Sequence, residues 1–281
     1  MNIVKKNIKR MRHLSRRYEV APHSDMTLIE DAKNMITKQV WKIGDCVELM
    51  RSEVANNSID LILTSPPYED ISGAGYNGAK KDILFFKLYS QFINDLFKEY
   101  YRVLKDTGQI FFNIKSKTHK TALRTPHWIE FTDAFNKFKL KSYIIWKYAG
   151  SFDSTDKRFH LDYEIIYHLS KTDDIYLNED CGIKDALSSV WYVPHNIPKT
   201  ERLHPTQMPL ALAERVLMVA SREGDLVLDS FVGSGTTLKA CKKLNRNGIG
   251  FELNPSYEVF IKKSLSGELP LKTWADKEVV A

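Results

Sequence analysis

The pattern of apolar positions predicts alternating strands and helices. Ile59-Asp60-Leu61-Ile62-Leu63 is an almost continuous apolar run, which is typical of a parallel strand buried on both faces. Residues 83–104 have the helical spacing of a long amphipathic helix. Similar patterns predict further strands at 41–43, 109–114, 140–147, 161–169, 226–230 and 248–252, and helices at 46–51, 125–138, 209–222 and from 254 onward. This order is typical of an α/β fold with a doubly wound, mostly parallel sheet. Strands 140–147 and 161–169 are expected to pair antiparallel, giving one antiparallel edge strand.

A proline-rich motif, Thr64-Ser65-Pro66-Pro67-Tyr68, ends the strand predicted at 59–64. In open α/β sheets, ligands bind at the ends of strands. The two prolines stiffen the turn and have no N–H group, so the Pro66 carbonyl and the Ser65 hydroxyl can both accept from an NH2 group. Tyr68 adds an aromatic face that can stack on a base. The motif therefore predicts chemistry on an exocyclic amine, with a simple strand-ending turn as the alternative.

A glycine-rich turn follows the strand predicted at 226–230. It runs Asp229-Ser230-Phe231-Val232-Gly233-Ser234-Gly235-Thr236-Thr237 and leads into a helix. Such a turn lets a ligand approach the backbone, and the helix start offers N–H groups. The spacing matches neither the phosphate loop nor the complete G-x-G-x-x-G pattern. Glu252 ends the next strand, about 20 residues after Gly233, which is the offset at which an acid binds ribose hydroxyls. We therefore expect a ribose-bearing cofactor, with Asp229 facing a cationic or amine-bearing part of it.

These segments together resemble the amino-methyltransferase family of DNA methyltransferases. Residues 65–68 resemble the catalytic motif of that family, and residues 229–237 resemble its cofactor loop. The stretch His204-Pro205-Thr206-Gln207-Met208-Pro209 resembles the segment before the family's first helix, with Met208 in place of the usual lysine. The catalytic motif precedes the cofactor loop, as in the circularly permuted β group. The resemblance covers about residues 40–262.

The resemblance implies a Rossmann-like methyltransferase fold, S-adenosylmethionine as the cofactor and double-stranded DNA as the substrate. It implies a catalytic role for Ser65, Pro66, Pro67 and Tyr68. The permuted order would put strand 41–43 beside strand 248–252, so that Asp45 could accept from the adenine amine of the cofactor. An ordinary Gly-Asp turn at Asp45 and a core position for Phe231 are the alternatives. The expected cofactor-binding residues are Asp45, Thr206, Asp229, Phe231, Gly233, Gly235, Thr236 and Glu252.

The resemblance also bears on the base that is methylated. Serine at the first motif position favours N4 of cytosine in the family, whereas aspartate favours N6 of adenine. Acceptors at Ser65 and Pro66 would favour a pyramidal amine nitrogen, and the base would have to be flipped out of the duplex. We expect N4 of cytosine, with N6 of adenine as the alternative. A catalytically inactive DNA-binding protein with the same fold, and an enzyme acting on amines of RNA or protein, are the rival classes.

The composition narrows the chemistry. The chain has 281 residues, of which 43% are hydrophobic and 27% charged, and no apolar run approaches the length of a membrane span. Cys46, Cys181 and Cys241 are far apart, which favours a reducing cytoplasm and argues against a zinc site or a disulfide framework. None of them follows a proline, so the thiolate chemistry of cytosine C5 methylation is not expected. We expect a cytoplasmic protein with no metal and no membrane partner.

The charge distribution suggests a polyanionic partner. The formal net charge is +6, and the first 17 residues hold seven Lys or Arg residues and no acid. We divide the chain into a basic N-terminal helical arm (1–40), a catalytic methyltransferase domain (41–265) with a small target-recognition region (171–203), and a C-terminal tail (266–281). The expected DNA contacts, for which a solvated surface is the alternative, are Lys9, Arg10, Lys117, Lys120, Lys157 and Arg158. A cognate restriction endonuclease is a candidate functional partner, and both a monomer and a homodimer are consistent with the sequence.

Overall fold

The computed structural model describes residues 38–67, 83–115, 118–119, 122–123, 133, 136–148, 159–195 and 207–266. Several sequence predictions lie outside these residues and stay predictions. They concern Lys9, Arg10, Tyr68, Lys117, Lys120, Lys157, Arg158, Thr206, most of the helix expected at 125–138, and the tail from residue 267.

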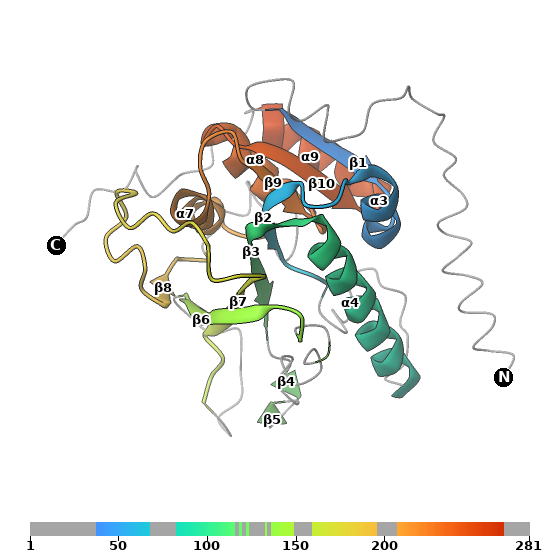
Figure 1. Ribbon diagram of the computed structural model, residues 1–281. Coiled ribbons are helices and arrows are strands. Elements are labelled where there is room, and N and C mark those ends of the chain that lie inside the picture. Colours follow the sequence, from blue (N-terminus) through green and yellow to red (C-terminus); the bar gives the residue numbers. More distant parts are fainter. Residues whose placement is uncertain are drawn as a thin grey trace, which may run out of the picture.

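An eight-stranded sheet forms the centre of the molecule (Figure 1). Its strands are, in spatial order, β1 (Gln39–Ile43), β10 (Asn247–Glu252), β9 (Leu226–Asp229), β2 (Ile59–Thr64), β3 (Leu104–Ile114), β7 (Tyr163–Ser170), β6 (Lys139–Lys147) and β8 (Val190–Tyr192). Neighbouring strands are parallel except where β7 pairs with β3 and β6. The predicted doubly wound, mostly parallel fold is confirmed, and β1 lies beside β10 as expected. A separate small hairpin contains β4 (Thr118–His119) and β5 (Ala122–Leu123).

The antiparallel strand lies inside the sheet, which corrects the edge position predicted for it. β7 lies between β3 and β6, and β8 forms the edge by pairing in parallel with β6. β8 comes from the segment 171–203, which has little sequence periodicity. Only the middle residue of this short strand is buried: Trp191 is 2% exposed and its indole donates to the Ser188 carbonyl at 2.6 Å. A strand with one inward residue leaves no alternating signal, and its target-recognition role stays a prediction.

The third strand of the sheet also begins earlier than predicted. β3 starts at Leu104, directly after the preceding helix, rather than at Gln109. Leu104 pairs with Ile59, and the next pair is Leu61 with Gln109, so residues 105–108 form an irregularity in the ladder. The Lys105 ammonium donates to Asp60 at 2.5 Å and holds this irregularity against β2.

Helices cover both faces of the sheet (Figure 1). α3 (Cys46–Glu53) and α4 (Ile83–Val103) pack on one face, while α7 (Leu210–Ala220) and α8 (Thr236–Lys243) pack on the other. α9 (Glu258–Ser266) follows the short helix η1 (Pro255–Tyr257) and packs against α8.

The residues of β2 alternate between these two helical layers. Ile59 and Ile62 join the cluster that contains α3 and α4, and Leu61 and Leu63 join the cluster that contains α7 and α8. Burial on both faces explains why the β2 sequence is almost continuously apolar. In the part of the chain that the structure describes, no helix combines the length and the apolar character needed to cross a membrane.

Candidate functional site

The carboxyl ends of β2 and β9 lie side by side in the middle of the sheet. β9 leads through α8 to β10 on one side, and β2 leads through α4 to β3 on the other, so the strand order reverses between β9 and β2. Open α/β sheets bind their ligands at such a switch point. Residues 65–67 leave the sheet here after β2, and residues 230–235 leave it here after β9. The fold therefore brings the candidate catalytic motif and the candidate cofactor loop to one place.

The candidate catalytic motif is anchored at its base. Pro66 is buried, whereas Ser65 and Pro67 are partly exposed. The preceding residue, Thr64, is fully buried, and its hydroxyl donates to Oδ1 of Asp229 at 2.8 Å. A direct side-chain hydrogen bond thus joins the strand that carries the motif to the residue at which the cofactor loop begins.

Asp229 is enclosed by donors from the protein itself. It is 5% exposed, and the same Oδ1 atom accepts from the backbone N–H of Phe231 at 3.0 Å. Burial raises the pKa of the Asp229 carboxyl, and hydrogen bonds from Thr237, Phe231 and Thr64 oppose that rise. Its direct contact with the cofactor stays a prediction, while its contacts within the protein organise the loop.

The sequence allowed two roles for Phe231, a contact with the cofactor or a position in the core, and its side chain is partly in the core and partly exposed. Its ring meets the ring of Phe92 from α4 edge-on, with the centroids 6.1 Å apart, and it packs at the margin of the apolar core. The side chain remains partly exposed, so one part of it supports the loop and the other part is open to a ligand. A contact with the cofactor stays a prediction.

Glu252 ends β10 and reaches the loop that follows β9. Its Oε2 accepts from the N–H of Gly233 at 2.9 Å, and its Oε1 accepts from the N–H of Asn254 at 2.8 Å. Burial raises the pKa of this carboxyl, with the Asn254 and Gly233 hydrogen bonds opposing it. The acid and the glycine loop, which the sequence separates by about one βα unit, are therefore in contact.

Asp45 lies at the end of the neighbouring strand, β1. The N–H of Gly44 donates to the Glu252 carbonyl at 2.8 Å, which sets the two strand ends together. Oδ1 of Asp45 accepts from the N–H groups of Val47 and Glu48 at 2.8 and 3.1 Å and so caps α3. Asp45 therefore lies beside Glu252 as the permuted strand order predicted, and its contact with adenine stays a prediction.

Gly235 in the loop and Gly250 in the neighbouring strand β10 lie where an added side chain would meet packed atoms, and Gly235 also has a left-handed backbone conformation. Gly235 has a φ of 83°, and a Cβ added there would lie 3.3 Å from the Cα of Ile261 in α9. A Cβ on Gly250 of β10 would lie 2.2 Å from a methyl group of Val232. The loop thus packs between β10 and α9. Thr236 opens α8 and is 5% exposed, with its hydroxyl 3.3 Å from that of Ser234.

Three carboxylates, those of Asp45, Asp229 and Glu252, gather at this edge of the sheet. Their negative field suits a ligand with a positive charge. Burial, together with the Asp45 and Glu252 charges, raises the pKa of the Cys46 thiol. Burial likewise raises the pKa of the Cys241 thiol, so both thiols are poorly suited to act as thiolate nucleophiles. Within the described ranges, no group of three or more His, Cys, Asp and Glu side chains is placed to hold a metal ion.

The sequence did not predict the buried residues that hydrogen-bond the base of the motif and of the cofactor loop. The buried Tyr100 of α4 donates its hydroxyl to the Ser230 hydroxyl at 3.0 Å, next to the Thr64–Asp229 pair. Thr64 carried a signal, because it is a hydroxyl residue that closes an apolar strand beside the motif. Tyr100 carried none, because an aromatic residue on an amphipathic helix is most simply explained by core packing.

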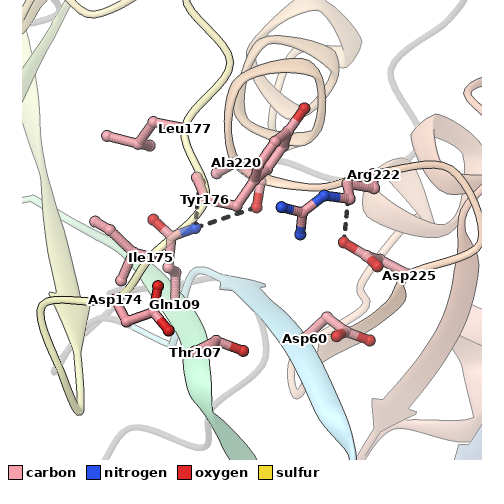
Figure 2. Close-up of a pocket in the computed structure, with 10 residues that line it drawn as sticks. All are labelled: Asp60, Thr107, Gln109, Asp174, Ile175, Tyr176, Leu177, Ala220, Arg222 and Asp225. Carbon is pink, nitrogen blue, oxygen red and sulfur yellow. Dashed lines mark hydrogen bonds between the residues drawn. The ribbon is translucent and has the colours of Figure 1, made fainter.

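A pocket of about 350 Å³ lies at the opposite, amino-terminal edge of the sheet (Figure 2). Its polar walls are tied to one another. The Gln109 side-chain amide donates to the carbonyls of Tyr176 and Ala220 at 2.7 and 3.3 Å. The backbone N–H of Arg222 donates to the Asp225 carboxylate at 2.7 Å, and the Arg222 guanidinium stacks on the Tyr176 ring. These contacts join the loop after β7 to the end of α7. The pocket is therefore separate from the predicted motifs.

Comparison with known proteins identifies the family. The N6/N4 methyltransferase profile, described as "DNA methylase", matches residues 59–263. The chain belongs to the S-adenosylmethionine-dependent DNA amino-methyltransferase family. The Type II methyltransferase M.HpaI of Haemophilus parainfluenzae is 34% identical over 231 residues, which cover 75% of this methyltransferase and 69% of the relative. The DNA adenine methyltransferase YhdJ of Escherichia coli (strain K12) is 29% identical over 246 residues, covering 76% and 78%.

Solved structures agree on the fold of this methyltransferase. The PvuII DNA methyltransferase, whose description is cytosine-N4-specific, superposes with a TM-score of 0.68 at 20% identity. The match covers 85% of this chain and 95% of that one. The family resemblance predicted from the three sequence segments is confirmed by the family match, and with it S-adenosylmethionine as the methyl donor.

Proposed function

We propose that this DNA methyltransferase modifies N4 of cytosine in double-stranded DNA, with Ser65, Pro66, Pro67 and Tyr68 as its catalytic motif. The observation that carries the proposal is the position of Ser65 and Pro66. They follow Thr64, whose hydroxyl is 2.8 Å from the carboxylate at the start of the cofactor loop. Serine at the first motif position supports cytosine. The relative that is a DNA adenine methyltransferase makes N6 of adenine the second candidate.

The residues at the switch point fit the cofactor. Glu252 already accepts from Gly233 and Asn254, and each carboxylate oxygen has a further lone pair for a ribose hydroxyl. The acidic edge suits a cationic ligand. The residues proposed to hold the cofactor are Asp45, Thr206, Asp229, Phe231, Gly233, Gly235, Thr236 and Glu252. When bound, S-adenosylmethionine supplies a methyl group on a positively charged sulfur.

The catalytic motif acts on the amine of the base. The lone pair of an exocyclic amine is shared with the aromatic ring, so the nitrogen is a poor nucleophile. The Ser65 hydroxyl and the Pro66 carbonyl accept its two N–H groups, which favours a pyramidal nitrogen with a directed lone pair. Pro67 keeps the turn rigid, and Tyr68 stacks on the flipped base. The methylated nitrogen then releases its proton to solvent, so the protein supplies position rather than a strong base.

The test reads the product and the role of Ser65 in one assay. Plasmid DNA is incubated with the protein and labelled S-adenosylmethionine, digested to nucleosides and analysed by mass spectrometry. We expect N4-methylcytosine, and N6-methyladenine alone would overturn the proposed base. Ser65→Ala should lower kcat by about 100-fold, the usual cost of removing one oriented hydrogen-bonding group. Ser58→Ala is the matched control, since its buried hydroxyl bonds the Ala55 carbonyl at 2.7 Å just before β2 begins. Equal activity of the two variants would refute the role of Ser65.

We also propose how this methyltransferase meets its partners. The basic residues proposed to contact the DNA backbone are Lys9, Arg10, Lys117, Lys120, Lys157 and Arg158. The Type II relative supports a cognate restriction endonuclease as the functional partner.

A further inference from the structure

The backbone ladder between the two functional strands stops short of the site. β2 and β9 pair through Leu61 with Val227 and through Ile62 with Leu228. Thr64 and Asp229 both follow the last of these pairs, so their contact across the gap is made by side chains. The Thr64 hydroxyl donates to Asp229 at 2.8 Å, over a sequence separation of 165 residues. This hydrogen bond connects the two strands at the level where the motifs begin.

The acceptor atom of this hydrogen bond also holds the cofactor loop. Oδ1 of Asp229 receives the Thr64 hydroxyl and the N–H of Phe231, which is 3.0 Å away. The carboxylate further interacts with the hydroxyl of Thr237, in the first turn of α8. One buried carboxylate therefore fixes the catalytic strand, the first turn of the loop and the helix that follows the loop.

A second buried hydrogen bond reaches the cofactor loop from α4, on the face of the sheet opposite to α8. Tyr100, on α4, is fully buried and donates to the hydroxyl of Ser230, which is 2% exposed, at 3.0 Å. Its hydroxyl also interacts with Thr64. α4 follows the catalytic motif in the chain, and Ser230 is the residue of the cofactor loop that directly follows Asp229. Segments on both sides of the motif are thus joined to the loop through groups that are shielded from water.

We propose that these four residues, Thr64, Asp229, Tyr100 and Ser230, form a latch that fixes the distance between the catalytic motif and the methyl donor. Thr64 is the central positioning residue of this latch. The proposal rests on the proposed role of Ser65 and Pro66 in gripping the amine. In-line transfer needs the two reacting atoms aligned, and a displacement of about 1 Å can cost about 100-fold in rate. A latch built from buried hydrogen bonds resists such a displacement because a broken bond would leave a buried carboxylate short of a donor.

The test compares Thr64→Val with Thr64→Ser. Valine keeps the shape of threonine but removes the hydroxyl, and serine keeps the hydroxyl. At saturating cofactor and DNA, we expect Thr64→Val to lower kcat by about 10- to 100-fold. Thr64→Ser should stay within about 3-fold of wild type, and Tyr100→Phe should show a smaller loss than Thr64→Val. Ser58→Ala again serves as the control, because it removes a buried hydroxyl just before the opposite end of β2.

A second readout needs neither DNA nor cofactor. Hydrogen exchange of a peptide covering residues 226–235 should be faster in Thr64→Val than in Thr64→Ser or Ser58→Ala, because the Phe231 N–H shares its acceptor with Thr64. Melting temperatures are measured in parallel, and kcat is compared at equal distance below each melting temperature. If Thr64→Val then matches Ser58→Ala in both kcat and exchange, the hydroxyl is only structural and the latch is refuted.

The same experiment separates this inference from the proposed function. A wild-type product other than N4-methylcytosine overturns the proposed base, while the ratio of Thr64→Val to Thr64→Ser still tests the latch on that product. A normal Ser65→Ala rate overturns the grip of Ser65 on the amine, whereas a slow Thr64→Val beside a near-normal Thr64→Ser still supports the role of Thr64 in positioning the motif. Faster exchange in Thr64→Val with an unchanged kcat would show that the hydrogen bond holds the cofactor loop but does not align the motif with the methyl donor. This result would also overturn the proposal.

Discussion

Glu252→Gln separates the two functions that the structure and the family give to this acid. In the free protein, its two oxygens accept from Gly233 and Asn254 at 2.9 and 2.8 Å. Glutamine can accept only one of these hydrogen bonds and turns an N–H group toward the other donor. A hydrogen bond to a charged group contributes about 1.5–3 kcal/mol, and partial exposure places Glu252 at the lower end. A loss of about 1.5 kcal/mol corresponds to a decrease of about 3–6 °C in melting temperature.

Cofactor affinity should fall for a separate reason. The amide replaces a charged acceptor of a ribose hydroxyl by a neutral group, a second loss of about 1.5–3 kcal/mol that appears in binding. We therefore expect the Kd for S-adenosylmethionine to rise by about 10- to 100-fold in calorimetric titration.

The control for this experiment is Glu53→Gln. This acid pairs with Lys42 at 2.7 Å at the other end of α3, and a surface pair of this kind contributes about 0–1 kcal/mol. Its Kd should equal that of the wild type. A Glu252→Gln protein with a lower melting temperature and a Kd within about 2-fold of wild type would refute the ribose contact and leave Glu252 as a brace for the loop.

Two further predictions concern the scaffold. In chemical denaturation, Gly235→Ala should lower the free energy of unfolding by more than Gly224→Ala does. Both glycines have a φ of 83°, where a side chain costs about 1–2 kcal/mol. Only Gly235 faces α9, where the added Cβ would lie 3.3 Å from the Cα of Ile261. Equal losses would show that contact with α9 is unimportant. Burial lowers the pKa of His168 from 6.5 to about 4. The stability that the neutral imidazole contributes, on the order of 3 kcal/mol, is therefore fully present above pH 6.5 and is lost as the pH falls through 4. Unfolding followed between pH 4 and 7 should show this slope, and His168→Gln should flatten it; an identical slope in the variant would contradict the assignment.

The sequence determined most of the strands and helices and both functional segments. The apolar run at β2 predicted a strand buried on both faces, since periodicity reports how many faces of an element are buried. The Ser65 motif and the Gly233 loop were likewise visible, because turn chemistry depends on residues that are adjacent in the chain. These local signals were sufficient for the family and for the order of its motifs.

The tertiary structure alone decided which elements meet. β7 lies inside the sheet because β6 pairs with its outer side, and β8, a short strand from a region without periodicity, takes the edge position beside β6. The need for glycine at position 235 comes from the approach of α9, which lies later in the chain. The sequence marks Thr64 and Asp229 as polar residues that each end a strand beside a motif, but only the fold places their side chains 2.8 Å apart. Contacts of this kind depend on the paths of segments that are distant in sequence, so no local pattern of residues can encode them.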